Sequence, residues 1–179
     1  MERDELAVSI LSVARLRGEF RLRSGATSAE YFDKYRFESR PDLLRAIARH
    51  LAPLVPPGTE VLAGLELGGV PIATALSLET GLPVAFVRKE AKSYGTCRVA
   101  EGAEVANRRV LIVEDVVTSG GQIVKSTEEL RALGAAVSCA VCVIDREAGG
   151  VESLAQSGLR LLALFTKSEL EASTAEPVR

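Results

Sequence analysis

The fold is decided by the stretch Val110-Leu-Ile-Val-Glu-Asp-Val-Val-Thr-Ser-Gly-Gly-Gln122. Four apolar residues at its start predict a buried strand, and Glu114 and Asp115 follow at the carboxyl end of that strand. The segment Thr118-Ser-Gly-Gly121 then predicts a turn into a helix that begins at about Gln122. Such a turn presents backbone N–H groups and the amino end of a helix, and both favour a phosphate group.

The two carboxylates need a different partner, because they would repel a phosphate placed beside them. Vicinal ribose hydroxyls fit, since they donate hydrogen bonds to carboxylate oxygens. Thr118 and Ser119 add hydroxyl donors, and the two glycines let the backbone approach a ligand closely. The alternative is an ordinary strand, turn and helix with Thr118 or Ser119 as N-cap. The complete run favours a cradle for ribose 5-phosphate. It lacks the lysine of a nucleotide P-loop and the spaced glycines of a dinucleotide fingerprint.

The rest of the chain surrounds this run with alternating strands and helices. Apolar runs predict strands at 61–65, 83–87, 109–113, 136–144 and 160–165, and helical spacing predicts helices at 69–79, 122–133 and 150–156. Upstream, a helix over 2–17, short strands over 19–23 and 31–37 and a helix from Pro41 are predicted. This order predicts one α/β domain with a mostly parallel sheet, whose ligands bind at the carboxyl ends of the strands.

Composition excludes several classes of protein. The chain of 179 residues has 22 Lys and Arg against 24 Asp and Glu, so no basic excess favours nucleic acid. No apolar stretch is long enough to span a membrane and no targeting segment is recognisable, so we expect a cytoplasmic protein. Cys97, Cys139 and Cys142 have neither disulfide nor metal spacing, and His50 is the single histidine. We therefore assign no metal ligand, and expect Cys139 and Cys142 on opposite faces of a strand.

A basic segment follows the strand predicted at 83–87. Arg88, Lys89 and Lys92 place three cations within five residues, at the edge of the sheet where ligands bind. A solvated basic turn is the alternative, yet these cations suit a pyrophosphate group. The connection 88–108 is too long for an ordinary loop, which predicts a lid over the site.

The segment 110–122 resembles the phosphoribosyl pyrophosphate (PRPP) motif of type I phosphoribosyltransferases. Three further segments resemble the orotate phosphoribosyltransferase family. Arg88-Lys-x-x-Lys92 is similar to its catalytic loop, and Phe20-Arg-Leu-Arg-Ser-Gly25 with Tyr31-Phe-Asp33 is similar to its amino-terminal substrate segment. Asp145-Arg146 resembles the place of its orotate-contacting arginine, and the likeness runs from about Leu6 to Leu170.

The resemblance implies a type I phosphoribosyltransferase fold, with an N-terminal hood over 1–40 and a PRPP-binding core over 41–170. It implies transfer of ribose 5-phosphate from PRPP to orotate, in pyrimidine (UMP) biosynthesis, with Mg²⁺ as cofactor. It implies a homodimer in which Lys89 and Lys92 act in the neighbouring subunit's site. The implied PRPP-binding residues are Arg88, Lys89, Lys92, Glu114, Asp115, Val116, Val117, Thr118, Ser119, Gly120, Gly121 and Gln122. Arg88, Lys89 and Lys92 are also the implied catalytic residues, and Thr118, Arg146 and Arg23 the implied orotate contacts.

Arg146 has independent chemical support, because an arginine offers bidentate recognition of the carboxylate that distinguishes orotate from uracil. The chain departs from many members at Arg23 and Tyr94, and from some at Leu67-Gly68. Two alternatives stay open. One is a phosphoribosyltransferase for uracil or a purine, and the other is a non-catalytic PRPP sensor that binds RNA. The low aromatic content of 4% and the basic loop weigh against the sensor.

Overall fold

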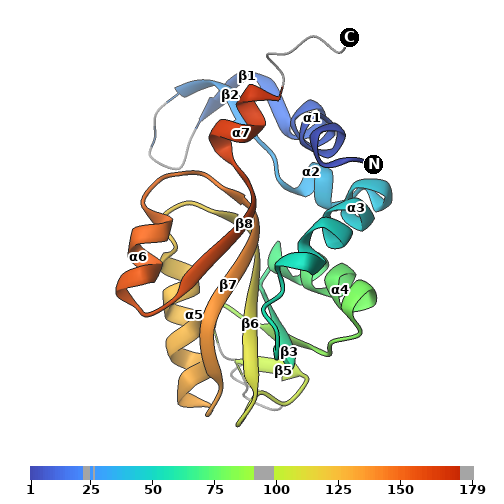
Figure 1. Cartoon of the computed structure of the whole chain (residues 1–179). Coiled ribbons are helices and arrows are strands. Elements are labelled where there is room, and N and C mark those ends of the chain that lie inside the picture. Colours follow the sequence, from blue (N-terminus) through green and yellow to red (C-terminus); the bar gives the residue numbers. More distant parts are fainter. Residues whose placement is uncertain (22–24, 26, 91–98, 174–179) are drawn as a thin grey trace.

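The computed structural model describes residues 1–21, 25, 27–90 and 99–173 (Figure 1). The strands are β1 (Arg15–Arg21), β2 (Thr27–Phe32), β3 (Val61–Leu65), β4 (Val84–Val87), β5 (Ala100–Gly102), β6 (Arg109–Val117), β7 (Ala136–Asp145) and β8 (Arg160–Thr166). The helices are α1 (Arg3–Ala14), α2 (Tyr35–Glu38), α3 (Pro41–Leu51), α4 (Gly69–Thr80), α5 (Gly121–Ala132), α6 (Gly150–Gln156) and α7 (Lys167–Ala172), with a 3₁₀ turn η1 (Ala52–Leu54).

The core is a six-stranded sheet of order β5-β4-β3-β6-β7-β8. β3 pairs in parallel with β4 and β6, and β7 in parallel with β6 and β8, whereas the edge strand β5 is antiparallel to β4. The predicted mostly parallel α/β sheet is confirmed. Its central strand is β6, the strand that carries the paired acids.

Helices cover both faces of the sheet. Side chains alternate along each strand, so both faces are apolar and both pack against helices. Leu111 and Val113 of β6 belong to the apolar cluster shared with α1, α3 and α4. Val110 and Ile112 belong to the opposite cluster, shared with α5 and α6. Figure 1 shows α3 and α4 on one side of the sheet and α5 and α6 on the other. The sheet is therefore buried on both faces, as expected for parallel strands.

A small antiparallel hairpin, β1 with β2, stands apart from the central sheet. Figure 1 shows this hairpin and α7 at one end of the molecule, beyond the carboxyl end of β8. The hairpin thus lies near the edge of the sheet where a ligand was predicted to bind.

Several predicted boundaries were wrong, including the starts of the two hairpin strands, which lie at Arg15 and Thr27. The first helix ends at Ala14, because β1 starts at Arg15. The strand predicted over 31–37 ends at Phe32, since Asp33 accepts a hydrogen bond from the backbone N–H of Tyr35 and opens α2, which buries Phe37. The strand predicted over 109–113 continues to Val117, because β7 pairs with it along that length. The long connection predicted over 88–108 contains a short strand, β5, that the sequence pattern did not reveal.

The cysteines that the structure describes are structural. Cys139 packs in the cluster of α1, α3 and α4, and Cys142 packs in the cluster of α5 and α6. The predicted opposite orientation is confirmed, and burial raises the pKa of both thiols. Cys97 lies outside the described residues. Within the described ranges, none of the helices has the length and apolar character needed to cross a membrane.

Candidate active site

The paired acids sit inside strand β6 rather than after it. Neighbouring residues of a strand point to opposite faces of the sheet. Asp115 therefore lies on the same face as Val113, towards α4, and Glu114 lies on the same face as Ile112, towards α5. Asp115 is fully buried, and Glu114 is partly exposed. Glu114 lines a cavity of about 170 Å³, together with the turn that follows the strand.

That turn is the predicted phosphate cradle. Val116–Ile123 and Glu114 line the cavity, and α5 begins at Gly121 on its rim. Gly120, the N-cap of α5, has a φ of 75°, a conformation that favours glycine. Gly150 closes the turn from behind, because a Cβ there would lie 2.7 Å from Val117 Cγ1. One cavity is therefore lined by the residues predicted to bind PRPP from Val116 onward: Val116, Val117, Thr118, Ser119, Gly120, Gly121 and Gln122.

Asp115 is enclosed by the neighbouring segment at Gly68. A Cβ on Gly68 would lie 1.6 Å from Asp115 Oδ2, so the carboxylate occupies the space of a side chain there. The peptide bond between Glu66 and Leu67, just before it, is cis. Asp115 Oδ1 accepts a hydrogen bond of 2.5 Å from the backbone N–H of Val116. The carboxylate is thus fixed on both sides.

Two residues of the hood complete an ionic cluster around Asp115. Lys34 Nζ lies 2.5 Å from Asp115 Oδ2, and the buried Glu38 comes from the next helix, α2. Burial raises the pKa of Glu38 to about 9, and its interaction with Asp115 adds to the rise. Burial also opposes ionisation of Asp115, but interactions with Glu38, Glu114 and Lys34 outweigh it and lower the Asp115 pKa. Near neutral pH, Asp115 is therefore ionised and Glu38 protonated.

Glu114 is electrostatically different from its neighbour. Burial, followed by the charge of Asp115, raises the pKa of Glu114 well above its ordinary range. Glu114 Oε2 is buried and has no hydrogen-bond partner among the described residues. Asp115 is paired with Lys34, and the raised pKa of Glu114 lowers the negative charge beside the cradle. The acids therefore repel a nearby phosphate much less than two free carboxylates would.

Arg146 lies beside the phosphate cradle. Asp145, the last residue of β7, pairs with Val117, and the backbone N–H of Arg146 donates a 2.9 Å hydrogen bond to the carbonyl of Val117. Arg146 also lines a cavity of about 240 Å³ with Tyr31 and Phe32 of the hood hairpin. The predicted orotate contact thus meets aromatic side chains next to the turn.

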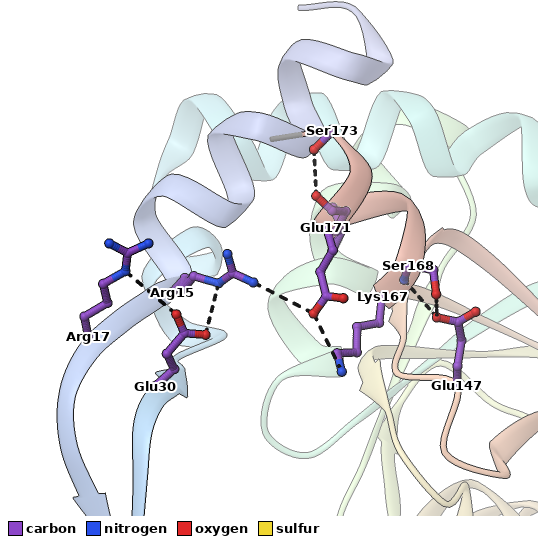
Figure 2. A network of polar contacts seen from close by, with 9 residues as sticks. Arg15, Arg17, Glu30, Glu147, Lys167, Ser168, Glu171 and Ser173 are labelled. Carbon is purple, nitrogen blue, oxygen red and sulfur yellow. Dashed lines mark hydrogen bonds and ion pairs between the residues drawn. The ribbon is translucent and has the colours of Figure 1, made fainter. Parts of the chain in front are cut away.

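Ion pairs connect the hairpin to α7 around this second cavity (Figure 2). Arg15 Nε lies 3.5 Å from Glu30 Oε2, across the hairpin, and Arg15 Nη2 lies 3.8 Å from Glu171 Oε1 on α7. Lys167 Nζ lies 3.6 Å from the same oxygen of Glu171. Arg15, Lys167, Glu30 and Glu171 all line the cavity. Its walls therefore carry three cations, Arg15, Arg146 and Lys167, and two carboxylates, which pair with Arg15 and Lys167.

The basic loop is described only in part. Arg88 Nε lies 3.4 Å from Glu101 Oε1 of β5. The backbone N–H of Lys89 donates to Glu66 Oε2 at 3.1 Å, and its carbonyl accepts from Lys125 Nζ at 3.1 Å. Both residues follow β4, at the edge of the sheet that also holds the cradle. Lys92, Arg23 and Tyr94 lie outside the described residues.

Sequence reasoning missed three residues of this region: Lys34, Glu38 and Lys125. Nothing in the local pattern distinguished Lys34 or Glu38, because both reach Asp115 only through the tertiary packing of the hood on the core. Lys125 lies in α5, three residues after Gln122. Residues three apart in a helix are neighbours on its surface, so this spacing could have indicated that Lys125 lies near the motif.

The residues present fit a divalent cation whose oxygen ligands come chiefly from the substrate of the protein. Among the described residues, no group of three or more His, Cys, Asp or Glu side chains has the arrangement of a metal site. The unpartnered oxygen of Glu114 is nevertheless of the hard, oxygen-donor kind that Mg²⁺ accepts.

Comparisons with known proteins agree with this geometry. Residues 38–158 match the model of the phosphoribosyl transferase domain family. The orotate phosphoribosyltransferase of a Nocardioides species is 54% identical over 168 residues, covering 94% of each chain. That of Methanocella arvoryzae is 44% identical, covering 86% of this chain and 87% of its own.

A solved structure adds the fold. Mycobacterium tuberculosis orotate phosphoribosyltransferase in complex with PRPP superposes with a TM-score of 0.82 at 29% identity, covering 94% of this chain and 98% of its own. The predicted type I phosphoribosyltransferase fold is thereby confirmed. The chain belongs to the phosphoribosyl transferase family and, within it, to the orotate phosphoribosyltransferases.

Proposed function

We propose that the chain catalyses the reaction that names its family, the transfer of ribose 5-phosphate from PRPP to orotate. The products are orotidine 5′-monophosphate and pyrophosphate, in the pathway that makes UMP. The observation that carries the proposal is the position of Arg146, whose backbone N–H binds the last residue of β6, at the start of the cradle. A site for an anionic base thus adjoins a site for a ribose phosphate.

The cradle would hold the 5-phosphate of PRPP. Backbone N–H groups at the start of α5 and the hydroxyls of Thr118 and Ser119 supply donors for phosphate oxygens. Glu114 would accept hydrogen bonds from the ribose hydroxyls, and Asp115, buried beside it against Lys34 and Gly68, would hold this end of β6 in place. Glu114 Oε2 supports this assignment, because it is a buried acceptor without a partner among the described residues.

The cavity beside Arg146 would hold orotate. Tyr31 and Phe32 offer faces against which a flat pyrimidine ring stacks, and the Arg146 guanidinium suits its carboxylate. Thr118 and Arg23 are the further predicted contacts. Uracil has no carboxylate to match the Arg146 guanidinium, which favours orotate over uracil.

In the reaction, the bond between ribose C1 and a pyrophosphate oxygen breaks, and its electron pair leaves with pyrophosphate. N1 of orotate forms the new bond to C1 and gives up its proton. Bond breaking runs ahead of bond making, so positive charge develops on the ribosyl centre and negative charge on the pyrophosphate. Arg88, Lys89 and Lys92 would stabilise the departing group by position and charge. The lid predicted over 88–108, which would exclude water, can involve only the part before β5, and residues 91–98 of that part lie outside the described residues.

Mg²⁺ would arrive with PRPP and neutralise charge on the pyrophosphate. Substrate and water would supply most of its oxygen ligands, with Glu114 as the protein group of suitable chemistry. The assembly proposed from the resemblance is a homodimer that shares Lys89 and Lys92 between sites. The division into a hood over 1–40 and a core over 41–170, and the cytoplasmic location, stay predictions.

A direct assay tests the proposal. Purified protein is mixed with PRPP, Mg²⁺ and one base from a panel of orotate, uracil, adenine and guanine, and pyrophosphate release is measured. We expect release with orotate and loss of orotate absorbance in the same sample. Release with uracil or a purine, and none with orotate, would contradict the proposal. Omission of Mg²⁺ tests the cofactor, and sedimentation of the protein tests the dimer.

A further inference from the structure

Lys34 joins the hood to the strand that carries the acids. It lies between β2 and α2, yet its Nζ is 2.5 Å from Asp115 Oδ2 on β6. The side chain of Asp115 is 0% exposed and that of Lys34 is 31% exposed. The carboxylate is therefore cut off from water, and the ammonium spans from the carboxylate to the surface. Among the described residues, this is the ion pair of Asp115.

The position of the carboxylate leaves little freedom. Gly68 leaves room for Oδ2 where any Cβ would clash, and the N–H of Val116 binds Oδ1. Glu38, protonated near neutral pH, contributes no compensating positive charge. Lys34 is thus the cation that balances the buried Asp115. A buried carboxylate without its partner is strongly destabilised, so without Lys34 the end of β6 that carries Asp115 would lose its position.

We propose that Lys34 is a positioning residue for PRPP: its contact with the buried Asp115 fixes the end of β6, and with it the neighbouring Glu114 and Val116 that line the cradle, so that binding of the ribose phosphate depends on the seating of the hood. This inference rests on the proposed function and deepens it. Lys34 acts through Asp115 rather than by its own contact with the substrate. The hood, which carries the aromatic side chains of the base cavity, is in this way connected to the ribose end of the site.

The test is a double-mutant cycle between Lys34→Met and Asp115→Asn, with kinetics for both substrates. We expect Lys34→Met to raise the KM for PRPP by about tenfold or more, the cost of one charge-assisted interaction, and the KM for orotate by less than about twofold. In the Asp115→Asn background, Lys34→Met should change the KM for PRPP by less than about twofold. Lys34→Arg, which keeps the charge, should recover part of the loss.

Arg40→Met is the matched control. Arg40 also forms an ion pair of 2.5 Å, with Asp42, but both side chains are about half exposed. Exposed pairs contribute little, so this variant should keep the wild-type KM values. An unchanged KM for PRPP in folded Lys34→Met, or an equal rise in the Asp115→Asn background, would overturn the proposal.

If Lys34→Met fails to fold, the double variant with Asp115→Asn still tests the proposal. The double variant carries no unpaired buried charge, so it should fold as well as Asp115→Asn alone, measured by thermal unfolding. If it does not, Lys34 has a structural role independent of Asp115 and the proposal fails. PRPP binding measured by calorimetry needs no orotate, so this test remains separate from that of the proposed reaction.

Discussion

The backbone N–H of Arg146 donates a 2.9 Å hydrogen bond to the carbonyl oxygen of Val117. Val117 is the last residue of β6, and Thr118 opens the phosphate cradle directly after it. This hydrogen bond continues the pairing of β6 with β7 by one residue, so the base cavity and the cradle adjoin at the ends of two neighbouring parallel strands. Positioning of this kind matters for a transfer reaction, because both reactants must meet at the anomeric carbon.

Replacement of Arg146 by Gln should act on the base alone. The change removes the guanidinium but leaves the backbone hydrogen bond to Val117, so the cradle keeps its geometry. Loss of a charge-assisted bidentate contact, worth roughly 1.5–3 kcal/mol, should raise the KM for orotate by about ten- to a hundredfold. Steady-state kinetics should show a KM for PRPP within about twofold of wild type. A parallel rise in both values would refute the assignment.

Glu147 should position Arg146 from the next residue. Its carboxylate accepts hydrogen bonds from the backbone N–H of Ser168, at 2.8 Å, and from the Ser168 hydroxyl, at the start of α7 (Figure 2). These bonds lower the pKa of the Glu147 carboxylate. The backbone of Glu147 has a φ of 55°, in the left-handed region. We expect Glu147→Ala to raise the KM for orotate severalfold, with the KM for PRPP unchanged.

Ser168→Ala is the graded comparison for that prediction. It removes the hydroxyl donor and leaves the backbone donor, so its effect on orotate should be smaller than that of Glu147→Ala. The reverse order of effects would show that α7 is held by other contacts.

The sheet and the cradle could be predicted because they depend on local pattern. Val110–Val113 is continuously apolar, which marks a strand buried on both faces, and Thr118–Gly121 carries the turn residues at its end. The end of β6 could not be predicted, because Glu114 and Asp115 are poor strand residues by composition. Their strand conformation is imposed by pairing with β7, which is visible only in the fold.

The ionic cluster could not be predicted for a related reason. Lys34 and Glu38 are 81 and 77 positions from Asp115 along the chain, as their residue numbers give. Gly68 read as a simple helix start, whereas its missing side chain accommodates the Asp115 carboxylate. Local sequence gives no measure of which distant residues share a buried space.

That shared space makes Gly68→Ala a sharp test. The new Cβ would lie 1.6 Å from Asp115 Oδ2, so either β6 or the segment that contains Gly68 must shift. We expect a loss of about 1–3 kcal/mol in the free energy of unfolding, the usual cost of overpacking, with a raised KM for PRPP. In an Asp115→Ala background, which has no carboxylate at this place, Gly68→Ala should cost much less than it does in the wild type. An equal cost of Gly68→Ala in both backgrounds would contradict the contact.

The protonation of Glu38 predicts a pH dependence of stability. Its pKa is about 9 in the folded protein against an ordinary 4.5, so between these values the folded state holds a proton that the unfolded state releases. The stability that this group contributes is therefore full below about pH 4.5 and is lost as the pH rises towards 9. Glu38→Gln keeps a hydrogen-bond donor for Asp115, but its amide does not ionise between pH 5 and 9. Urea unfolding from pH 5 to 9 should show a slope smaller than that of wild type by up to ~1.4 kcal/mol per pH unit.

Glu128→Gln, on the exposed side of α5, makes the same change in net charge and serves as the control. Burial also raises the pKa of Glu114, which gives a slope of the same sign, so Glu38→Gln should flatten the dependence without abolishing it. If wild type and Glu38→Gln lose stability in parallel from pH 5 to 9, Glu38 is ionised in the folded protein. Asp115 would then face a second buried negative charge, and Lys34 alone could not balance both.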